Sequence, residues 1–470
     1  MQTKKLHNLL LKNFAFEPTS QQHEVIDQLS EYVTDSLARG LFLLKGYAGT
    51  GKTTLVSALV KSLWPVGKNV VLLAPTGRAA KVLSSYSGKK AFTIHKKIYW
   101  LKTNSKGNTY VTLQKNKHSN AVFVVDEASM IPDVSDKVFG GRSLLDDLIE
   151  YVYDGINCKL ILIGDTAQLP PVNLDVSPAL DENVLVITYK RDVYSAELTQ
   201  VVRQQSDSLI LENATRLRDQ IAQKSKVTPT LFCDPEVVRL QSGMDLQDAL
   251  EDCYSQSGVE DTIVICRSNK RANLYSQQIR SKILWQEDEV SVGDYLMVVR
   301  NNYFWLPEGS KAGFIANGDT VEVLRIYEIN ELYNCRFARL SVRLVDYPDE
   351  ENLEVIVLLD TLTSETPAMT YEEYKALYAA VEEDYKDIPH KYQRNKEIKQ
   401  NPYFNALQVK FAYAITCHKS QGGQWENVFV EQGYFTPDMM GKEYLRWLYT
   451  AMTRATKKLY LVNFKDDFFG

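Results

Sequence analysis

The sequence predicts an α/β protein with two parallel-sheet cores in tandem and an insertion in each core. Short apolar runs alternate with helical patterns early in the chain, and a second such series follows. The runs are 41–44, 70–73, 122–125 and 160–163 in the first series, and 262–266, 408–415, 428–431 and 458–462 in the second. Apolar runs without polar alternation are typical of strands covered on both faces by helices. A chain of 470 residues is also long enough to bury more than one core.

Two segments interrupt these cores. Residues 96–120 contain Tyr99, Trp100, a Lys106-Gly107-Asn108 turn and Tyr110, which together predict a β-hairpin. The second segment begins with strand-like runs and continues into a charged, tyrosine-rich helical stretch, which predicts a small β-barrel with a helical insert. The predicted domains are 1–178 for the first core, 179–295 with 406–470 for the second, and 296–405 for the barrel and its helices at 371–400.

The composition is that of an ordinary globular protein, with 44% hydrophobic and 24% charged residues and a net charge of −5. That charge argues against a surface coated in positive charge but allows a local basic groove. The six cysteines form no close pair and no metal-ligand spacing with histidine, which predicts reduced thiols. No apolar stretch approaches the roughly 18 residues of a membrane span, and the N-terminus predicts an amphipathic helix without a signal peptide. We therefore expect a soluble, cytoplasmic protein with no membrane partner.

Residues 46–53 match the pattern G-x-x-x-x-G-K-[ST], between a predicted strand and a predicted helix. In this pattern the glycines let backbone N–H groups wrap phosphates, and the helix N-terminus favours negative charge. Lys52 would neutralise β/γ charge, and Thr53 could bind Mg²⁺. A chance glycine-rich turn is the alternative. The residues expected to bind a nucleoside triphosphate are Gly46, Gly49, Thr50, Gly51, Lys52, Thr53 and Thr54.

Two further strand ends carry polar residues. The run 122–125 leads into Asp126 and Glu127, and paired carboxylates there suit a metal-binding Asp126 and a Glu127 that orients or deprotonates the attacking water. The alternative is an exposed acidic turn without a role in catalysis. After the run 160–163 comes a proline-containing loop with Gln168, which could contact the γ-phosphate and report its loss.

The ordered motifs resemble those of the superfamily 1B helicases, and within them the RecD-like and phage Dda-like group. The matching segments are Gln22, 46–53, 74–81, 93–95, 126–129, 164–172, Arg203, 416–422 and 449–454. This resemblance implies two RecA-like P-loop domains in tandem, a hairpin insertion in the first, and an SH3-like barrel with a helical insertion in the second. It also implies ATP and Mg²⁺ as cofactors, and single-stranded and forked duplex DNA as partners.

The resemblance also assigns roles to single residues. Gln22 would read adenine, with Gln21 as the alternative if the register slips by one. Arg203 and Arg454 would reach the γ-phosphate from the second domain, although either would pass for a surface arginine on its own. The residues that resemble the DNA-facing motifs are Thr76, Arg78, Thr93, His95, Thr416, His418 and Ser420. Each of the two histidines could instead be a buried structural residue. The roles of Ser268-Asn269-Lys270 and Arg280 stay open, and the 371–400 insert is either a solvated helical face or a clamp for a partner or DNA.

The predicted hairpin suggests a strand-separating wedge. Its turn puts Tyr110 near the tip, where an aromatic ring could stack on the last base pair. Tyr110 could instead face solvent on its strand, or it could pack against the second insertion. Tyr99 and Trp100 lie at the base of the hairpin, where core packing is expected.

Three function classes fit these motifs to different degrees. The first is an ATP-dependent helicase that moves 5′ to 3′ on single-stranded DNA. A superfamily 1 RNA helicase or remodeller of RNA–protein complexes would use similar motifs, and stimulation of hydrolysis by oligo-dT or by oligo-U would separate the two. A P-loop switch or small-molecule kinase without unwinding is disfavoured by the arginines and the Gln168 loop.

Overall fold

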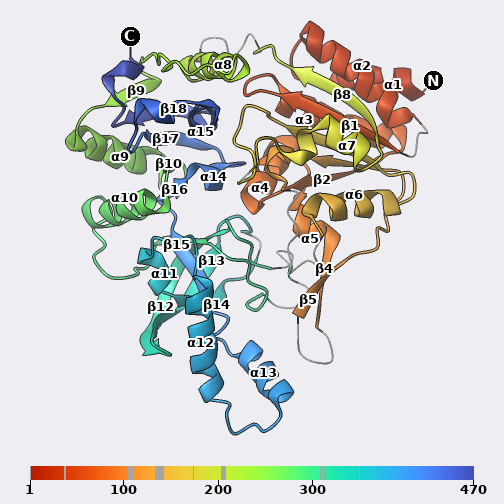
Figure 1. Cartoon of the computed structure of the whole chain (residues 1–470). Helices are drawn as coiled ribbons and strands as arrows, with labels where there is room; N and C mark the ends of the chain where they lie inside the picture. The colour runs from red at the N-terminus through yellow and green to blue at the C-terminus, as the bar shows by residue number, and fades with distance from the viewer. Residues whose placement is uncertain are drawn as a thin grey trace.

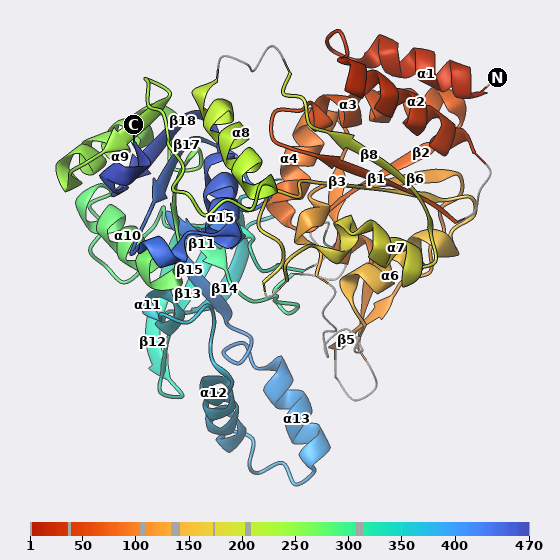
Figure 2. The ribbon, with the colours of Figure 1, turned by 45° about the horizontal axis from the view of Figure 1, so that its top comes forward.

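The computed structural model describes residues 2–35, 39–103, 109–132, 142–172, 174–202, 208–306, 310, 314–348 and 350–469, with the backbone alone for 101–103 and 109–111. Two α/β domains lie side by side, and a β-barrel lies beneath the second domain (Figure 1). A pair of helices extends from the barrel away from the rest of the chain in both views (Figures 1 and 2). The predicted α/β class, with two tandem cores and a small barrel, is confirmed.

The first domain contains a six-stranded parallel sheet in the order β3-β2-β6-β7-β1-β8. Alternate residues of β1 face opposite layers, with Phe42 and Leu44 in one apolar cluster and Leu41 and Leu43 in the other. This two-sided burial is why the strand reads as a continuous apolar run. The strands are β1 (Gly40–Gly46), β2 (Asn69–Ala74), β3 (Ala91–Thr93), β6 (Ala121–Val125), β7 (Lys159–Gly164) and β8 (Asp192–Leu198). The helices are α1 (Gln2–Asn13), α2 (Ser20–Thr34), α3 (Lys52–Leu63), α4 (Gly77–Ser87), α5 (Ile94–Ile98), α6 (Leu144–Asp154) and α7 (Glu182–Ile187).

The first sheet extends beyond the predicted boundary at residue 178. Strand β8 pairs in parallel with β1 from Gly40↔Asp192 to Gly46↔Leu198, so the sheet reaches Leu198. The sequence does not predict β8, because this edge strand has several exposed polar residues and no continuous apolar stretch.

The second domain contains a five-stranded parallel sheet in the order β16-β10-β17-β18-β9. Three of its predicted runs lie within β10, β17 and β18. The strands are β9 (Val237–Leu240), β10 (Thr262–Cys266), β16 (Ala414–Thr416), β17 (Trp425–Glu431) and β18 (Ala455–Val462). The helices are α8 (Leu209–Ala222), α9 (Gly243–Ser257), α10 (Asn269–Lys282), α14 (Cys417–Ser420) and α15 (Lys442–Met452).

The inserted domain is a closed five-stranded barrel with a helical extension. Its strands are β11 (Tyr295–Val298), β12 (Thr320–Leu332), β13 (Cys335–Leu344), β14 (Leu353–Leu358) and β15 (Leu407–Phe411). Its helices are α11 (Asp360–Thr363), α12 (Tyr371–Glu383) and α13 (Lys391–Gln400). The single strand predicted at 408–415 is wrong, because β15 closes the barrel and β16 then joins the second sheet. The barrel therefore continues past the predicted boundary at 405.

The predicted hairpin is present as β4 (Tyr99–Thr103) and β5 (Thr109–Leu113), with Lys102 opposite Tyr110. Its turn at 106–108 lies outside the described residues. Tyr99 is buried as expected, whereas the prediction for Trp100 is wrong, since its side chain is 58% exposed. Among the described helices, none combines the length and apolar character that crossing a bilayer requires.

Candidate functional site

The loop between β1 and α3 is shaped to hold an anion. Gly49 and Gly51 have positive φ angles of 74° and 86°, and a Cβ on Gly51 would lie 2.3 Å from Gln22 Nε2. Helix α3 begins at Lys52 with no side-chain cap, so side chains leave its first backbone N–H groups unpaired. An uncapped helix N-terminus after a glycine-rich loop is suited to bind a phosphate group.

The side chains of this loop fit a triphosphate. Lys52 Nζ donates to the carbonyls of Gly46 and Tyr47, both at 2.7 Å, so the ammonium lies over the loop. The buried Thr50 hydroxyl donates to Tyr47 O at 2.8 Å and holds the loop backbone. The Thr53 side chain is exposed at the start of α3 and is open to a ligand.

The two carboxylates predicted to act in hydrolysis follow β6. Asp126 Oδ1 accepts from the Glu127 N–H at 2.9 Å, and Asp126 Oδ2 accepts from the Tyr86 hydroxyl at 2.6 Å. Burial raises the pKa of Glu127 to about 7, with Asp126 acting in the same direction and Arg454 opposing it. The described residues contain no group of three or more acidic, histidine or cysteine side chains for a metal. The Thr53 hydroxyl and the Asp126 carboxylate are oxygen ligands of the kind that Mg²⁺ takes together with phosphate and water, and they would hold this ion.

The second domain delivers Arg454 to these carboxylates. Its NH1 lies 3.9 Å from Glu127 Oε1, and the residue is 4% exposed. The guanidinium is held from behind, because its Nε donates to Thr450 O at 3.0 Å and its NH1 to Gly423 O at 3.3 Å. Arg203 lies outside the described residues. The described chain before it ends at Val202, whose N–H donates to Gly49 O at 3.0 Å.

Helix α15 also contacts the loop that follows β7. The Leu169 N–H donates to Thr450 Oγ1 at 2.9 Å, and Arg446 NH2 donates to Thr166 O at 3.1 Å. Gln168 is 6% exposed, and its Oε1 has no hydrogen-bond partner within the part of the chain that is described. Contact of Gln168 with the γ-phosphate stays a prediction.

Both ends of the Gln22 amide form hydrogen bonds within the first domain. It is 2% exposed, its Oε1 accepts from Thr19 N at 2.9 Å, and its Nε2 donates to Thr50 O at 3.0 Å. The sequence Thr19 to Gln22 is thus a capping box that ties α2 to the phosphate loop. The alternative, Gln21, binds Thr199 through both ends of its amide. Adenine reading by either residue stays a prediction.

The predicted DNA-facing residues of the first domain lie at the carboxyl ends of β2 and β3. Thr76 caps α4 by accepting from Ala79 N at 3.2 Å, and Thr93 caps α5 by accepting from Lys96 N at 3.2 Å. His95 is half-buried, with its ring 5.8 Å from that of Tyr99. Because β2 and β3 are neighbours, these residues share one edge of the sheet.

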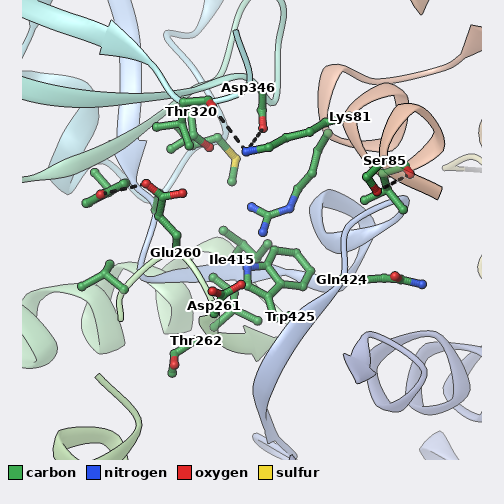
Figure 3. A pocket seen from close by; sticks show the side chains of 18 residues that line it. Lys81, Ser85, Glu260, Asp261, Thr262, Thr320, Asp346, Ile415, Gln424 and Trp425 are labelled. Atoms are coloured by element: carbon green, nitrogen blue, oxygen red, sulfur yellow. Dashed lines mark hydrogen bonds and ion pairs between the residues drawn. The ribbon is translucent and has the colours of Figure 1, made fainter. Parts of the chain in front are cut away.

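Arg78 lies at a junction of three domains. Its guanidinium lies 3.8 Å from the ring centre of Trp425, beside a cavity of about 210 Å³ lined by α4, the second domain and the barrel. Figure 3 shows Lys81 pointing toward Asp346 on the barrel side of this cavity. Lys81 Nζ lies 3.7 Å from Asp346 Oδ1. Burial lowers the pKa of Arg78. In this arrangement Arg78 links the domains.

The predicted DNA-facing residues of the second domain differ in exposure. Thr416 is half-buried at the end of β16, and its hydroxyl makes no cap bond to α14, while His418 is exposed. Ser420 is fully buried, and its hydroxyl donates to Cys417 O at 2.8 Å. The hydroxyl of Ser420 is therefore turned away from the surface, which a sequence motif alone does not reveal.

Two family models match this chain at the elements just described. An AAA domain matches residues 19–228, and a UvrD-like helicase C-terminal domain matches residues 411–462. Together they cover more than half of the chain, and they include the phosphate loop, the carboxylates and Arg454. In both of these regions the chain is similar to helicases of superfamily 1B.

Individual proteins resemble the chain over different lengths. The chain is 30% identical over 262 residues to the ATP-dependent DNA helicase Dda of Enterobacteria phage T4, and this match covers 54% of the chain and 55% of Dda. It is 24% identical over 511 residues to the uncharacterized protein R530 of Acanthamoeba polyphaga mimivirus, covering 94% of the chain and 98% of R530. A crystal structure of Pif1 helicase from Bacteroides with ADP-AlF3 and single-stranded DNA is 16% identical, covers 97% of the chain and 95% of that protein, and has a TM-score of 0.46. The match to Dda thus covers about half of each protein, and the match to R530 covers nearly all of both.

Sequence reasoning missed several residues of the helicase site. Tyr86 holds Asp126, and Arg446, Tyr449 and Thr450 of α15 contact the first domain. Tyr449 and Thr450 stand inside the motif that ends at Arg454, which is the one signal that could have drawn attention to them. Nothing in the sequence marks Tyr86, because its partner follows 40 residues later on another element.

Proposed function

We propose that this helicase hydrolyses ATP to move 5′ to 3′ along single-stranded DNA and to unwind duplex DNA. The observation that carries the proposal is the ion pair of Arg454 with Glu127, because it joins the catalytic parts of the two domains in one site. Such a site is complete only when the domains are together, which is the requirement for coupling hydrolysis to domain movement. The direction of movement comes from the family resemblance.

The residues of the site divide the chemical work. The backbone N–H groups at the start of α3 and the Lys52 ammonium bind the β- and γ-phosphates. Thr53 and Asp126 would hold Mg²⁺, whose contribution when bound is neutralisation of phosphate charge. Glu127 in its carboxylate form orients the attacking water or takes its proton. Arg454 stabilises the charge that develops on the γ-phosphate, for which a guanidinium fork is suited.

The proposed DNA contacts lie on both domains. Thr76, Thr93 and His95 lie at strand ends of the first sheet, and Thr416 and His418 follow β16 of the second. Hydroxyl and imidazole groups that contact phosphates give a grip that does not depend on sequence, as movement along a strand requires. T4 Dda, by its name an ATP-dependent DNA helicase, supports DNA as the substrate. The six thiols, all free and four of them buried, support a reducing compartment such as the cytoplasm.

Unwinding of tailed duplexes tests the proposal. Duplexes with a 5′ tail, a 3′ tail or no tail are incubated with ATP, using either a DNA or an RNA loading strand. We expect unwinding of the 5′-tailed DNA alone, with Lys52→Ala as the inactive control. Unwinding from 3′ tails would contradict the direction, and equal activity on RNA loading strands would contradict the preference for DNA.

A further inference from the structure

One side chain of the second domain reaches the phosphate loop directly. The Tyr449 hydroxyl lies 2.6 Å from Asp165 Oδ2 and accepts a hydrogen bond from the Ala48 N–H at 2.9 Å. Ala48 belongs to the phosphate loop after β1, and Asp165 follows β7, the strand paired with β1. Tyr449 is 1% exposed. Three segments of two domains therefore meet at one hydroxyl group.

The Tyr449 hydroxyl donates one hydrogen bond and accepts another. A phenol has one proton, so Tyr449 donates to Asp165 and accepts from Ala48. The other oxygen of Asp165 accepts from the Ala167 N–H at 2.8 Å, and Asp165 is 1% exposed. Burial raises the pKa of Tyr449 well above its ordinary value. Separation of the domains would break the hydrogen bonds of Tyr449 with Asp165 and Ala48, and water would have to replace them.

Helix α15 ends at Met452, shortly before the catalytic arginine, and two hydrogen bonds tie Thr453 and Arg454 back to its last turn. The Thr453 hydroxyl donates to Tyr449 O at 2.8 Å, and Arg454 Nε donates to Thr450 O at 3.0 Å. Figure 2 shows α15 on the side of the second domain that faces the first. A shift of the phosphate loop at Ala48 would thus move Tyr449 in the last part of α15, and with it Arg454, which lies against Glu127.

We infer that Tyr449 is a positioning residue that couples occupancy of the phosphate loop to docking of the second domain and of Arg454. This inference rests on the proposed ATP-driven function. Tyr449 acts through the Ala48 amide and Asp165 and does not itself contact the phosphates. Its hydroxyl transmits the state of the phosphate loop because its two bonds can both form only when the loop and α15 are in register.

The test compares Tyr449→Phe with Tyr444→Phe in the full-length chain. Tyr444 lies on the same helix, is 2% exposed, and its hydroxyl accepts from Gln432 Nε2 at 3.3 Å within the second domain. Turnover of ATP is measured with and without oligo-dT. We expect Tyr449→Phe to lower the ratio of stimulated to basal turnover by about ten- to a hundred-fold, the factor that one hydrogen bond to a charged group carries. Tyr444→Phe should leave that ratio unchanged.

A binding measurement separates coupling from a merely structural role. Affinity of a non-hydrolysable ATP analogue is measured with and without oligo-dT, since coupling between two ligands must be reciprocal. In the wild type oligo-dT should tighten analogue binding, and in Tyr449→Phe that effect should disappear. If Tyr449→Phe does not fold, Asp165→Asn keeps an oxygen acceptor for the phenol while removing the charge, and it should lose part of the coupling.

The outcomes distinguish this inference from the proposed function. Basal and stimulated turnover that fall by the same factor in Tyr449→Phe, or coupling that persists, would show a static contact and overturn the inference alone. The same loss in Tyr444→Phe would also overturn it. A wild-type chain whose hydrolysis ignores oligo-dT would overturn the proposed function, and the inference with it.

Discussion

Arg454 lies 3.9 Å from Glu127, although the two residues belong to different domains and are separated by most of the chain. The arginine is buried, while about a fifth of the Glu127 side chain is exposed. Arg454 of the second domain lowers the pKa of Glu127, because a nearby guanidinium favours the carboxylate form that burial disfavours.

Removal of the guanidinium should abolish turnover while sparing ATP binding. Arg454→Ala is expected to lower kcat by about 10³- to 10⁵-fold, the range of an arginine finger, because charge on the γ-phosphate would lose its partner. Steady-state hydrolysis and equilibrium binding of a non-hydrolysable analogue measure the two quantities. Arg454→Lys is the control for charge without the fork, and weakened binding with normal kcat would disprove the assignment.

The pH dependence of hydrolysis should report Glu127. Its pKa is raised to about 7, so the carboxylate fraction increases from pH 6 to pH 8. We expect kcat/KM to rise across this window and to fall as pH drops below 7. Because the folded protein favours the protonated form, the contribution of Glu127 to stability declines as pH rises from its ordinary value of 4.5 to about 7.

The Glu127→Gln variant tests the predicted effect of Glu127 on stability. Relative to the wild type, its Tm should be higher at pH 8 than at pH 5, since the amide has no charge to desolvate. A profile of kcat/KM that is flat between pH 6 and pH 8 in the wild type would contradict the role of Glu127 as the ionising base.

Loss of Lys52 should separate hydrolysis from DNA binding. Lys52→Ala removes the ammonium that lies over the loop carbonyls, and we expect turnover to fall by at least about 10³-fold. Binding to labelled oligo-dT, followed by fluorescence anisotropy, should survive because no predicted DNA contact is touched. Lys61→Ala, an exposed lysine at the other end of α3, is the matched control and should retain both activities.

The sequence predicted the buried strands well, and its errors have a common cause. Apolar runs identify strands covered on both faces, but they do not say which sheet a strand joins. The run 408–415 therefore predicts one strand, although Phe411 ends a barrel strand and Ala414 begins a sheet strand. Strand β8 carries exposed polar residues at a sheet edge, so its sequence lacks the pattern altogether.

The site was predictable where chemistry is local. Lys52, Asp126 and Glu127 follow their own strands, so a motif specifies their surroundings. Contacts between distant segments are different, because the bond of Ala48 to Tyr449 joins residues 401 positions apart. Burial is equally hidden, as Ser420 shows by turning its hydroxyl inward.

Arg280, whose role the sequence left open, should be essential for stability. Its Nε and NH2 donate to the two oxygens of Asp294 at 2.8 and 2.9 Å, and Asp294 is fully buried. Arg280→Ala would leave that charge uncompensated, a loss of about 3 to 5 kcal/mol. Chemical denaturation measures it, and Arg280→Ala with Asp294→Asn together should recover part of the loss. A loss below about 1 kcal/mol in the single variant would show that the pair does not anchor the barrel.

The last prediction concerns strand separation by the hairpin of β4 and β5. Movement along a strand does not by itself open a duplex, since stacking of about 1.4 kcal/mol per step must be overcome at the fork. Tyr110 stands opposite Lys102, next to the last described pair of the hairpin, Thr103 with Thr109. We propose that its ring stacks on the terminal base pair, a contact worth roughly 1 to 3 kcal/mol. Tyr110→Ala should then slow unwinding of tailed duplexes about five-fold or more while leaving translocation on single strands intact. Trp100→Ala is the matched control, because Trp100 is exposed on the same hairpin but pairs with Thr112, farther from the turn. Loss of both activities in Tyr110→Ala, or of neither, would remove Tyr110 from the fork, and an equal defect in Trp100→Ala would assign the effect to the hairpin as a whole.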